Sequence, residues 1–376
     1  MTAAAEDTAP SAPRTGKGAL TRTSLAALAG IAIMIAIFAP QNQKFDQLAL
    51  GPETLAMFGG YQGDVIHCTT IDTAAQCLTP ATQRNLRPMI VWAGNSQLHG
   101  VNQPKAGDET APVLLARDLR PRGVEVLAFS QPNADLQEHE LLFEYLLAQR
   151  KPDVFILPVC FDDTREDGVR DEMAVGFKDP AVRRALEGAP LGVRLARAQQ
   201  NASLPGDAKK TLQEVVEARL EADHSALWSA RAQARGTIAD NLYVLRNSVL
   251  GIQPTSKRRT IEPIYRRNMD ALHAILARAR AQNVRVLTYV TPLRNDVAPP
   301  YDAAEYDRFK KEVRTLAAAE GATFADLENL VPANDWGTKN STRSMNGQEI
   351  DFMHFQGAGH VLLKQAIAAQ VAPMLK

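Results

Sequence analysis

The sequence has no excess of charge of either sign. Its 42 Lys and Arg residues equal its 42 Asp and Glu residues, over a length of 376 residues. A nucleic-acid-binding surface needs a basic field, so this balance argues against nucleic acid as a partner. Internal repeats are also absent, while 45% of the residues are hydrophobic. We therefore expect one large globular domain or two modest ones.

Cysteine is scarce, with three residues in the whole chain. Cys68 and Cys77 lie in a short polar segment, and a loop of this size can close as a disulfide in an oxidising compartment. Two free thiols are the alternative. Cys160 ends an apolar run, which predicts a buried, small hydrophobic residue. His67 with the two nearby cysteines lacks a fourth ligand, so we expect no metal and no other cofactor.

Charged residues are missing from residues 23–39. This apolar run is near the lower limit of about 17 to 25 residues that a helix needs to span a bilayer. Basic residues in the tail at 1–22 predict that the tail stays in the cytoplasm and that everything after residue 40 is exported. A cleaved signal peptide is the alternative, but Ile37 occupies a position that signal peptidase requires to be small. We expect an uncleaved anchor, followed by a membrane-proximal segment at 40–87.

Apolar runs typical of buried strands alternate with helical patterns in the rest of the chain. Continuous runs of this kind predict strands that are buried on both faces of a parallel sheet. They occur at residues 88–92, 124–129, 154–159, 284–290 and 322–327. Apolar residues at helical spacing predict helices at 136–149, 268–282, 303–320 and 358–375. The alternation predicts an α/β fold for residues 88–376.

Residues 163–260 interrupt this alternation. Charged, helix-favouring sequence predominates there, with prolines at 180, 190 and 205 that mark helix starts and stops. We expect an inserted helical subdomain. Its polar helices fit a solvated face as well as a lid or a partner surface.

Ser96 follows the first long apolar run, after Gly94 and Asn95. Ligands of open parallel sheets bind beyond the carboxyl ends of the strands, where a turn into a helix would expose this hydroxyl. A serine in this position is also a common helix N-cap. His99, three residues further on, is expected on the surface of that helix, with the lining of a pocket as the alternative.

Asp351 and His354 lie near the other end of the chain, just before the last expected helix. A serine hydroxyl needs a neighbouring base to become nucleophilic, and an imidazole base needs a carboxylate to fix its tautomer. Asp and His three residues apart on one loop can reach the same point. Together with Ser96 they form a candidate catalytic triad.

These two blocks resemble those of the SGNH hydrolases. That superfamily carries its nucleophilic serine in a short motif after the first strand and an Asp-x-x-His block close to the C-terminus. Ser96 and the pair Asp351 and His354 match both blocks in place and order. The resemblance implies a flavodoxin-like parallel sheet flanked by helices.

Within that superfamily the chain is most similar to the DltD family, membrane-anchored proteins of D-alanyl-lipoteichoic acid biosynthesis. The similarity rests on one N-terminal anchor, the serine motif near residue 100, a long helical insertion, a Pro-rich stretch at 289–301, and Gly359 after the Asp-x-x-His block.

The usual oxyanion donors of SGNH enzymes are not found at their expected places. The segment at 130–133 lacks the glycine that follows the second strand, and the segment at 160–163 lacks the asparagine that follows the third. We expect the backbone N–H of Ser96 to bind the oxyanion, together with Asn133 or a donor near Ser130. Asp162 and Asp163 are expected to be capping or surface residues.

The resemblance implies an enzyme of the cell envelope. Its substrate would be an acylated polysaccharide, a teichoic-acid-like polymer or a glycolipid outside the cytoplasmic membrane, in the periplasm if the cell is Gram-negative. A membrane-bound O-acyltransferase is the implied partner. Hydrolysis and acyl transfer both remain open. A non-catalytic envelope scaffold is the competing interpretation.

Overall fold

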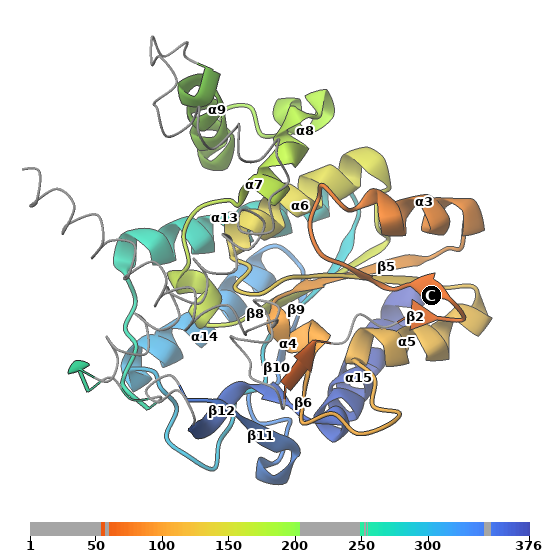
Figure 1. Cartoon of the computed structure of the whole chain (residues 1–376). Helices are drawn as coiled ribbons and strands as arrows, with labels where there is room; N and C mark the ends of the chain where they lie inside the picture. The colour runs from red at the N-terminus through yellow and green to blue at the C-terminus, as the bar shows by residue number, and fades with distance from the viewer. Residues whose placement is uncertain (1–53, 57–59, 204–248, 252, 254, 342–346) are drawn as a thin grey trace, which may run out of the picture.

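A computed structural model gives the structure of residues 54–56, 60–203, 249–251, 253, 255–341 and 347–376 (Figure 1). The expected anchor at 23–39 lies outside these residues. Within them, no helix is both long and apolar enough to cross a membrane.

A six-stranded parallel sheet forms the centre of the molecule (Figure 1). From one edge to the other, its strands are β10 (Thr323–Asp326), β9 (Arg285–Val290), β8 (Val154–Val159), β5 (Met89–Gly94), β7 (Glu125–Ser130) and β4 (His67–Cys68). The five expected strands are all present, and the predicted α/β fold with a parallel sheet is confirmed.

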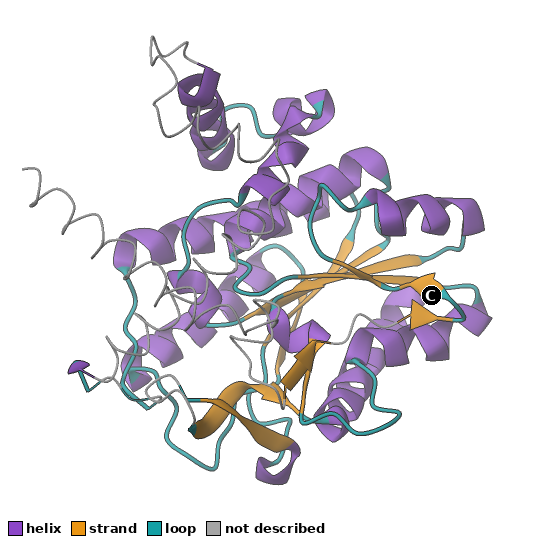
Figure 2. Cartoon of the chain, viewed as in Figure 1, coloured by secondary structure: helices purple, strands orange, loops and turns teal. Residues whose placement is uncertain are grey.

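Helices cover both faces of the sheet (Figure 2). Alternate residues of β5 point to opposite faces, so that Met89 and Val91 join one apolar core while Ile90 and Trp92 join the other. The first core contains residues of α3 (Ala75–Arg84), α6 (Leu136–Gln149), α13 (Glu262–Ala281) and α14 (Ala303–Ala319). The second contains residues of α5 (Ala111–Leu119), α15 (Gly357–Val371) and the 3-10 turn η5 (Ala372–Leu375).

In the part of the chain that the structure describes, three small antiparallel sheets lie outside the central one. They pair β1 (Thr54–Ala56) with β6 (Gly100–Asn102), β2 (Gly60–Tyr61) with β3 (Asp64–Val65), and β11 (Trp336–Asn340) with β12 (Gln348–Phe355). A short 3-10 turn, η4 (Ala333–Asp335), precedes β11, and another, η1 (Arg120–Arg122), follows α5.

The segment at 40–87 supplies part of the central sheet. Its strand β4 pairs with β7 at the sheet edge, where His67 lies opposite Ala128. A disulfide joins Cys68 in this strand to Cys77 in α3, with the two Cα atoms 6.1 Å apart. Both cysteines are buried in the core that α3 shares with α6. The disulfide therefore ties the edge strand to the helix that follows it.

The described part of the insertion is helical. After β8 come the 3-10 turn η2 (Asp162–Arg165), α7 (Asp171–Ala174), the 3-10 turn η3 (Val175–Lys178), α8 (Pro180–Ala185) and α9 (Pro190–Ser203). Residues 204–248 lie outside the described residues. Figure 1 shows α8 and α9 on the side of the molecule where α6 covers the sheet.

Candidate active site

Ser96 begins α4 (Ser96–His99), a single turn that starts where β5 ends. The turn is tight, because a Cβ on Gly94 would lie 2.5 Å from the Cδ1 of Leu98 and 3.0 Å from Cγ of Pro158. Only glycine leaves room for this approach. The side chain of Asn95 caps the turn by accepting a hydrogen bond from the N–H of Gln97 at 3.0 Å. Ser96 is thus a half-buried residue just after the cap.

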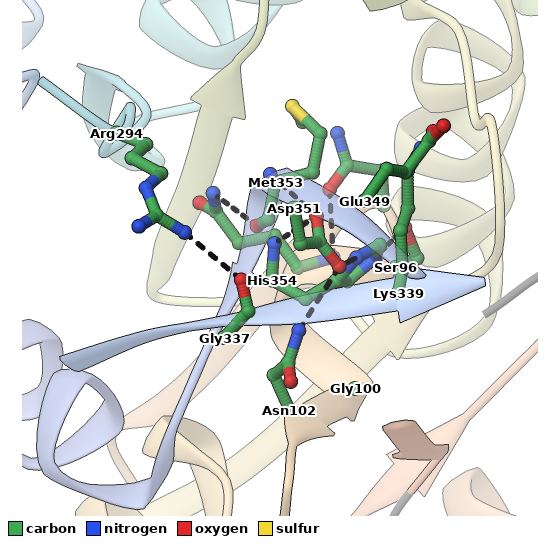
Figure 3. A network of polar contacts seen from close by, with 12 residues as sticks. Ser96, Gly100, Asn102, Arg294, Gly337, Lys339, Glu349, Asp351, Met353 and His354 are labelled. Atoms are coloured by element: carbon green, nitrogen blue, oxygen red, sulfur yellow. Dashed lines mark hydrogen bonds and ion pairs between the residues drawn. The ribbon is translucent and has the colours of Figure 1, made fainter. Parts of the chain in front are cut away.

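His354 meets Ser96 from the opposite end of the sequence. Its Nε2 lies 2.9 Å from Ser96 Oγ, and its Nδ1 lies 2.9 Å from Asp351 Oδ2 (Figure 3). An ionised carboxylate only accepts hydrogen bonds, so the proton of the ring is held on Nδ1. The lone pair of Nε2 is then free to accept the serine proton. The structure thus brings together the three residues that the sequence predicts as a triad.

The Asp-x-x-His block lies in strand β12 and not on a loop, which corrects the expectation from sequence. The pairing of β12 with β11 changes register between Ile350, opposite Thr338, and Phe355, opposite Trp336. Within this irregularity Asp351 Oδ1 accepts hydrogen bonds from the N–H groups of Met353 and His354, at 2.9 and 3.1 Å. This local turn brings the Asp351 carboxylate and the His354 ring together on one side of the strand.

Asn102 completes the surroundings of the carboxylate. This fully buried residue of β6 donates from Nδ2 to Asp351 Oδ2 at 3.1 Å (Figure 3). Burial alone raises the pKa of Asp351, but His354, Lys339 and the Met353 N–H outweigh it and lower that pKa to about 2. The carboxylate is therefore charged throughout the neutral range and can stabilise an imidazolium. Asn102 could not be recognised from the sequence, where its only signal is its place shortly after the serine.

Gln97 connects the serine turn to the histidine strand. Its Nε2 donates to the carbonyl oxygens of Met353, at 2.9 Å, and of Pro292, at 3.0 Å. The residue after the serine thus holds the residue before the histidine.

His99 is buried, with 2% of its surface exposed, and does not lie on a helix surface as expected. In the single turn of α4, Gln97, Leu98 and His99 are buried and Ser96 is partly exposed. His99 instead lines a cavity, which was the alternative expectation. The Nδ1 of His99 lies 3.2 Å from Ser130 Oγ, and Nδ1 of His67 lies 3.4 Å from the same oxygen. Burial first, and then the charges of His354 and His360, lower the pKa of His99 to about 3. This ring is therefore neutral beside the triad.

The two side chains expected at the oxyanion lie apart from the triad hydrogen bonds. Ser130 ends β7 opposite Gly94, and its hydroxyl faces the two histidine rings. Asn133 is exposed, has a positive φ of 52°, and lines a cavity. In the described part of the chain, neither side chain forms a hydrogen bond with Ser96 or His354.

The cavity has a volume of about 860 Å³ and opens beside α4. His99, which ends the turn that Ser96 begins, is part of its wall. Polar side chains make up most of the rest, including Gln131, Asn133, Asp135 and Arg170. Burial, opposed by the Glu138 N–H, raises the pKa of Asp135 to about 7. No cluster of three or more metal-ligating side chains occurs among the described residues.

Asp163 is the least expected of the buried polar groups. The sequence favours a cap or a surface position, but the carboxylate is 3% exposed and bonds to Asn95, the residue before Ser96. Two consecutive aspartates after a strand gave no signal that would separate Asp163 from Asp162.

No protein-family profile and no curated protein matches the sequence. Solved structures match over most of the chain. An alpha/beta hydrolase enzyme from the metagenome of Lake Arreo, Spain, is 12% identical, with 77% of this chain and 98% of that chain covered and a TM-score of 0.38. A putative acylhydrolase from Bacteroides fragilis is 10% identical, covers 79% and 95%, and has a TM-score of 0.36. A variant of an acetyl xylan esterase from Geobacillus stearothermophilus is 10% identical, covers 76% and 95%, and has a TM-score of 0.39. At such low identities and TM-scores, the function of this chain has to be inferred from its own site.

Proposed function

We propose that this chain is an SGNH-type serine esterase or O-acyltransferase in which Ser96 carries the acyl group. The observation that supports the proposal is the unbroken line of hydrogen bonds from Ser96 through His354 to Asp351 at the carboxyl end of β5. Ligands of parallel sheets bind at this end of the strands.

In the first half of the reaction, Ser96 Oγ attacks the ester carbonyl while its proton passes to His354 Nε2. Asp351 stabilises the imidazolium that forms. The tetrahedral intermediate then loses its alcohol, which takes the proton from Nε2, and acyl-Ser96 remains. In the second half, water or a sugar hydroxyl gives its proton to Nε2 and attacks the acyl carbon. The bond from that carbon to Ser96 Oγ then breaks, and Oγ takes the proton back from Nε2. Water yields hydrolysis, and a sugar hydroxyl yields acyl transfer.

The oxyanion needs hydrogen-bond donors aimed at the carbonyl oxygen. We assign the backbone N–H of Ser96 to this role, because an N–H in the first turn of a helix has no acceptor within the helix. Asn133 or a donor near Ser130 would supply the second hydrogen bond. Both flank the carboxyl end of β7, the strand that pairs with β5.

We further propose that the enzyme is anchored to the cytoplasmic membrane and acts on an exported glycopolymer or glycolipid, beside a membrane-bound O-acyltransferase. This part rests on the apolar segment at 23–39 and on the resemblance to DltD proteins. Most residues that line the cavity beside α4 carry hydrogen-bonding side chains, which supports a substrate with hydroxyl groups, because hydroxyl groups both donate to and accept from such side chains.

A non-catalytic scaffold is the second candidate. The observation that favours it is that residues 160–163, after the third predicted strand, contain no asparagine of the kind that typical SGNH enzymes use to bind the oxyanion. Such a protein would hold a polymer in the cavity without cleaving it.

Labelling with a fluorophosphonate probe distinguishes the two candidates. We expect the full-length protein in detergent to be labelled on Ser96, and Ser96→Ala to remain unlabelled. The matched control is Cys160→Ala, which removes another buried nucleophilic atom outside the triad and should be labelled normally. A well-folded wild-type protein that resists the probe would support the scaffold.

Mass spectrometry of the products separates hydrolysis from transfer. The full-length protein is incubated with an activated acyl ester, with and without a neutral oligosaccharide. An acylated oligosaccharide indicates transfer, while free acid at the same rate in both samples indicates hydrolysis.

A further inference from the structure

We propose that Asp163 is a positioning residue that holds Ser96 in line with His354. This inference rests on the proposed function and adds to it a residue that lies outside the triad. It follows from the hydrogen bonds around Asn95.

Both ends of the Asn95 amide are occupied. Its Oδ1 accepts from the N–H of Gln97 at 3.0 Å, and its Nδ2 donates to Asp163 Oδ1 at 2.8 Å and to Oδ2 at 3.1 Å. The amide therefore has one orientation. Asn95 and Asp163 are each 3% exposed, so water does not compete for these bonds. The side chain of Asn95, the residue before Ser96, is therefore held in one position by these hydrogen bonds.

Asp163 is itself fixed to the neighbouring strand. It lies in η2, directly after β8, and its Oδ2 accepts from the backbone N–H of Cys160 at 3.2 Å. On the other side of the serine, Gln97 donates to the carbonyl of Met353. Ser96 is thus held from β8 through Asn95 and from β12 through Gln97. The two attachments together set the distance between Ser96 Oγ and His354 Nε2.

Asp163 is buried without a cationic partner among the described residues, and this disfavours its charged form. Among the described ion pairs, none includes this carboxylate, while Asp162 and Asp135 lie near it. Burial first raises the pKa of Asp163 well above its usual range, the bonds from Asn95 and Cys160 oppose this, and the two aspartates add to it. A neutral amide would avoid the cost of burying a charge. A carboxyl group, however, presents two oxygens to the three N–H contacts, whereas an amide presents only one.

The test exchanges the amide of Asn95 and the carboxyl group of Asp163. In Asp163→Asn, one oxygen becomes an NH₂ that faces the N–H of Cys160 or the NH₂ of Asn95, so at least one contact is lost. In the double variant Asn95→Asp, Asp163→Asn, the amide introduced at 163 donates to the carboxylate introduced at 95. That carboxylate still accepts from Gln97, and the amide oxygen still accepts from Cys160. All the contacts can therefore re-form in the double variant.

The full-length protein and its variants are labelled with a fluorophosphonate over a range of probe concentrations. We expect Asp163→Asn to lower the limiting rate of labelling by about tenfold to a hundredfold, since small displacements of reacting groups have effects of this size. The probe concentration at half-maximal rate should stay unchanged. The exchanged double variant should recover most of the rate. Asp162→Asn is the matched control, because the Asp162 side chain pairs with Arg258 and not with Asn95, and it should label normally.

Wild-type rates in Asp163→Asn would overturn the inference, and so would a slow Asp163→Asn that the exchange does not rescue. Crystal structures of the two variants give a second measurement that needs no activity. The distance from Ser96 Oγ to His354 Nε2 should lengthen from 2.9 Å in the single variant and return in the double variant. If the wild type is not labelled but this distance behaves as expected, the proposed function fails while the positioning role stands. An unchanged distance in Asp163→Asn would refute the positioning role.

Discussion

The Nε2 of Gln97 lies 2.9 Å from the carbonyl oxygen of Met353, which joins the neighbour of Ser96 to the neighbour of His354 across most of the length of the chain. The turn α4, which contains Ser96, and the strand β12, which contains His354, are therefore joined by a direct hydrogen bond. Loss of either reacting group should leave the other in place but without a function.

Ser96→Ala and His354→Ala should accordingly give non-additive losses. Each single variant should lose about three orders of magnitude or more in turnover, and the double variant should be hardly worse than either one. Turnover of an activated ester measures this, with circular dichroism as the check on folding. A folded Ser96→Ala protein with full esterase or acyl-transfer activity would show that the triad assignment is wrong.

Asp351→Asn should be less damaging. The serine and the imidazole survive, but an NH₂ facing Nδ1 no longer holds the ring proton there, and the imidazolium loses its counter-charge. We expect a loss about one to two orders of magnitude smaller than that of Ser96→Ala. Turnover of Asp351→Asn and of Ser96→Ala, measured under the same conditions, gives the two losses for comparison. Equal losses in both would indicate that Asp351 also holds the site together.

Acid should destabilise the fold through its buried histidines. Burial is the main cause that lowers the pKa of His67, His99 and His139 to about 3 and that of His360 to about 4. Between about pH 6.5 and pH 4, the unfolded chain binds protons that the folded chain does not, so stability falls as pH falls. Each ring contributes about 1.4 kcal/mol per pH unit below 6.5.

His139→Leu tests this contribution, because both ring nitrogens of His139 are buried and have no hydrogen-bond partner among the described residues. Urea denaturation should show the variant gaining stability over the wild type as pH falls from 6.5 to 4. A constant difference over that range would contradict the prediction.

The disulfide between Cys68 and Cys77 should stabilise the fold through the unfolded state. For a loop of this size we expect a loss of about 2 to 3 kcal/mol in the free energy of unfolding for the double variant Cys68→Ser, Cys77→Ser. Cys160→Ser at the unpaired cysteine controls for the change of atom. Peptide mass spectrometry without reduction shows the bond directly, and two free thiols in exported protein would rule it out.

The membrane topology is tested by a fusion. Alkaline phosphatase placed after Lys44 should be active. The phosphatase folds only outside the cytoplasm, and the predicted anchor at 23–39 exports the residues that follow the anchor. Edman sequencing of the mature protein should find the N-terminal tail retained. An inactive fusion, or a chain that begins near residue 40, would exclude the anchored form.

The strands at the centre of the sheet could be predicted because each is a continuous apolar run that is buried on both faces. The edge strand β4 could not, since it has two residues, His67 and Cys68, and too few positions for any period. The helix α13 begins at Glu262, earlier than the expected 268, because Pro263 fits the first turn of a helix.

At the candidate site, order along the chain was enough to predict that Ser96, Asp351 and His354 lie together. Contacts that other residues make between distant segments could not be predicted from their order along the chain. Nothing local distinguishes Asp163 from a capping aspartate or Asn102 from an ordinary polar residue, because their roles depend on strands that meet only in the folded chain. His99 was misplaced because a single helical turn has no periodic face that sequence could reveal.

The helical insertion leaves and rejoins the core at nearly the same point. Arg258 pairs with Asp162 at the start of η2, and Nε of Arg165 donates to the carbonyl of Arg259 at 2.9 Å. These contacts join the two ends of the insertion directly to each other. Since the entropy of closing a loop grows only slowly with its length, this closing point lets a long insertion join the sheet at little extra entropic cost, while Met173, Phe177 and Val182 of its described part pack into the core beside α6.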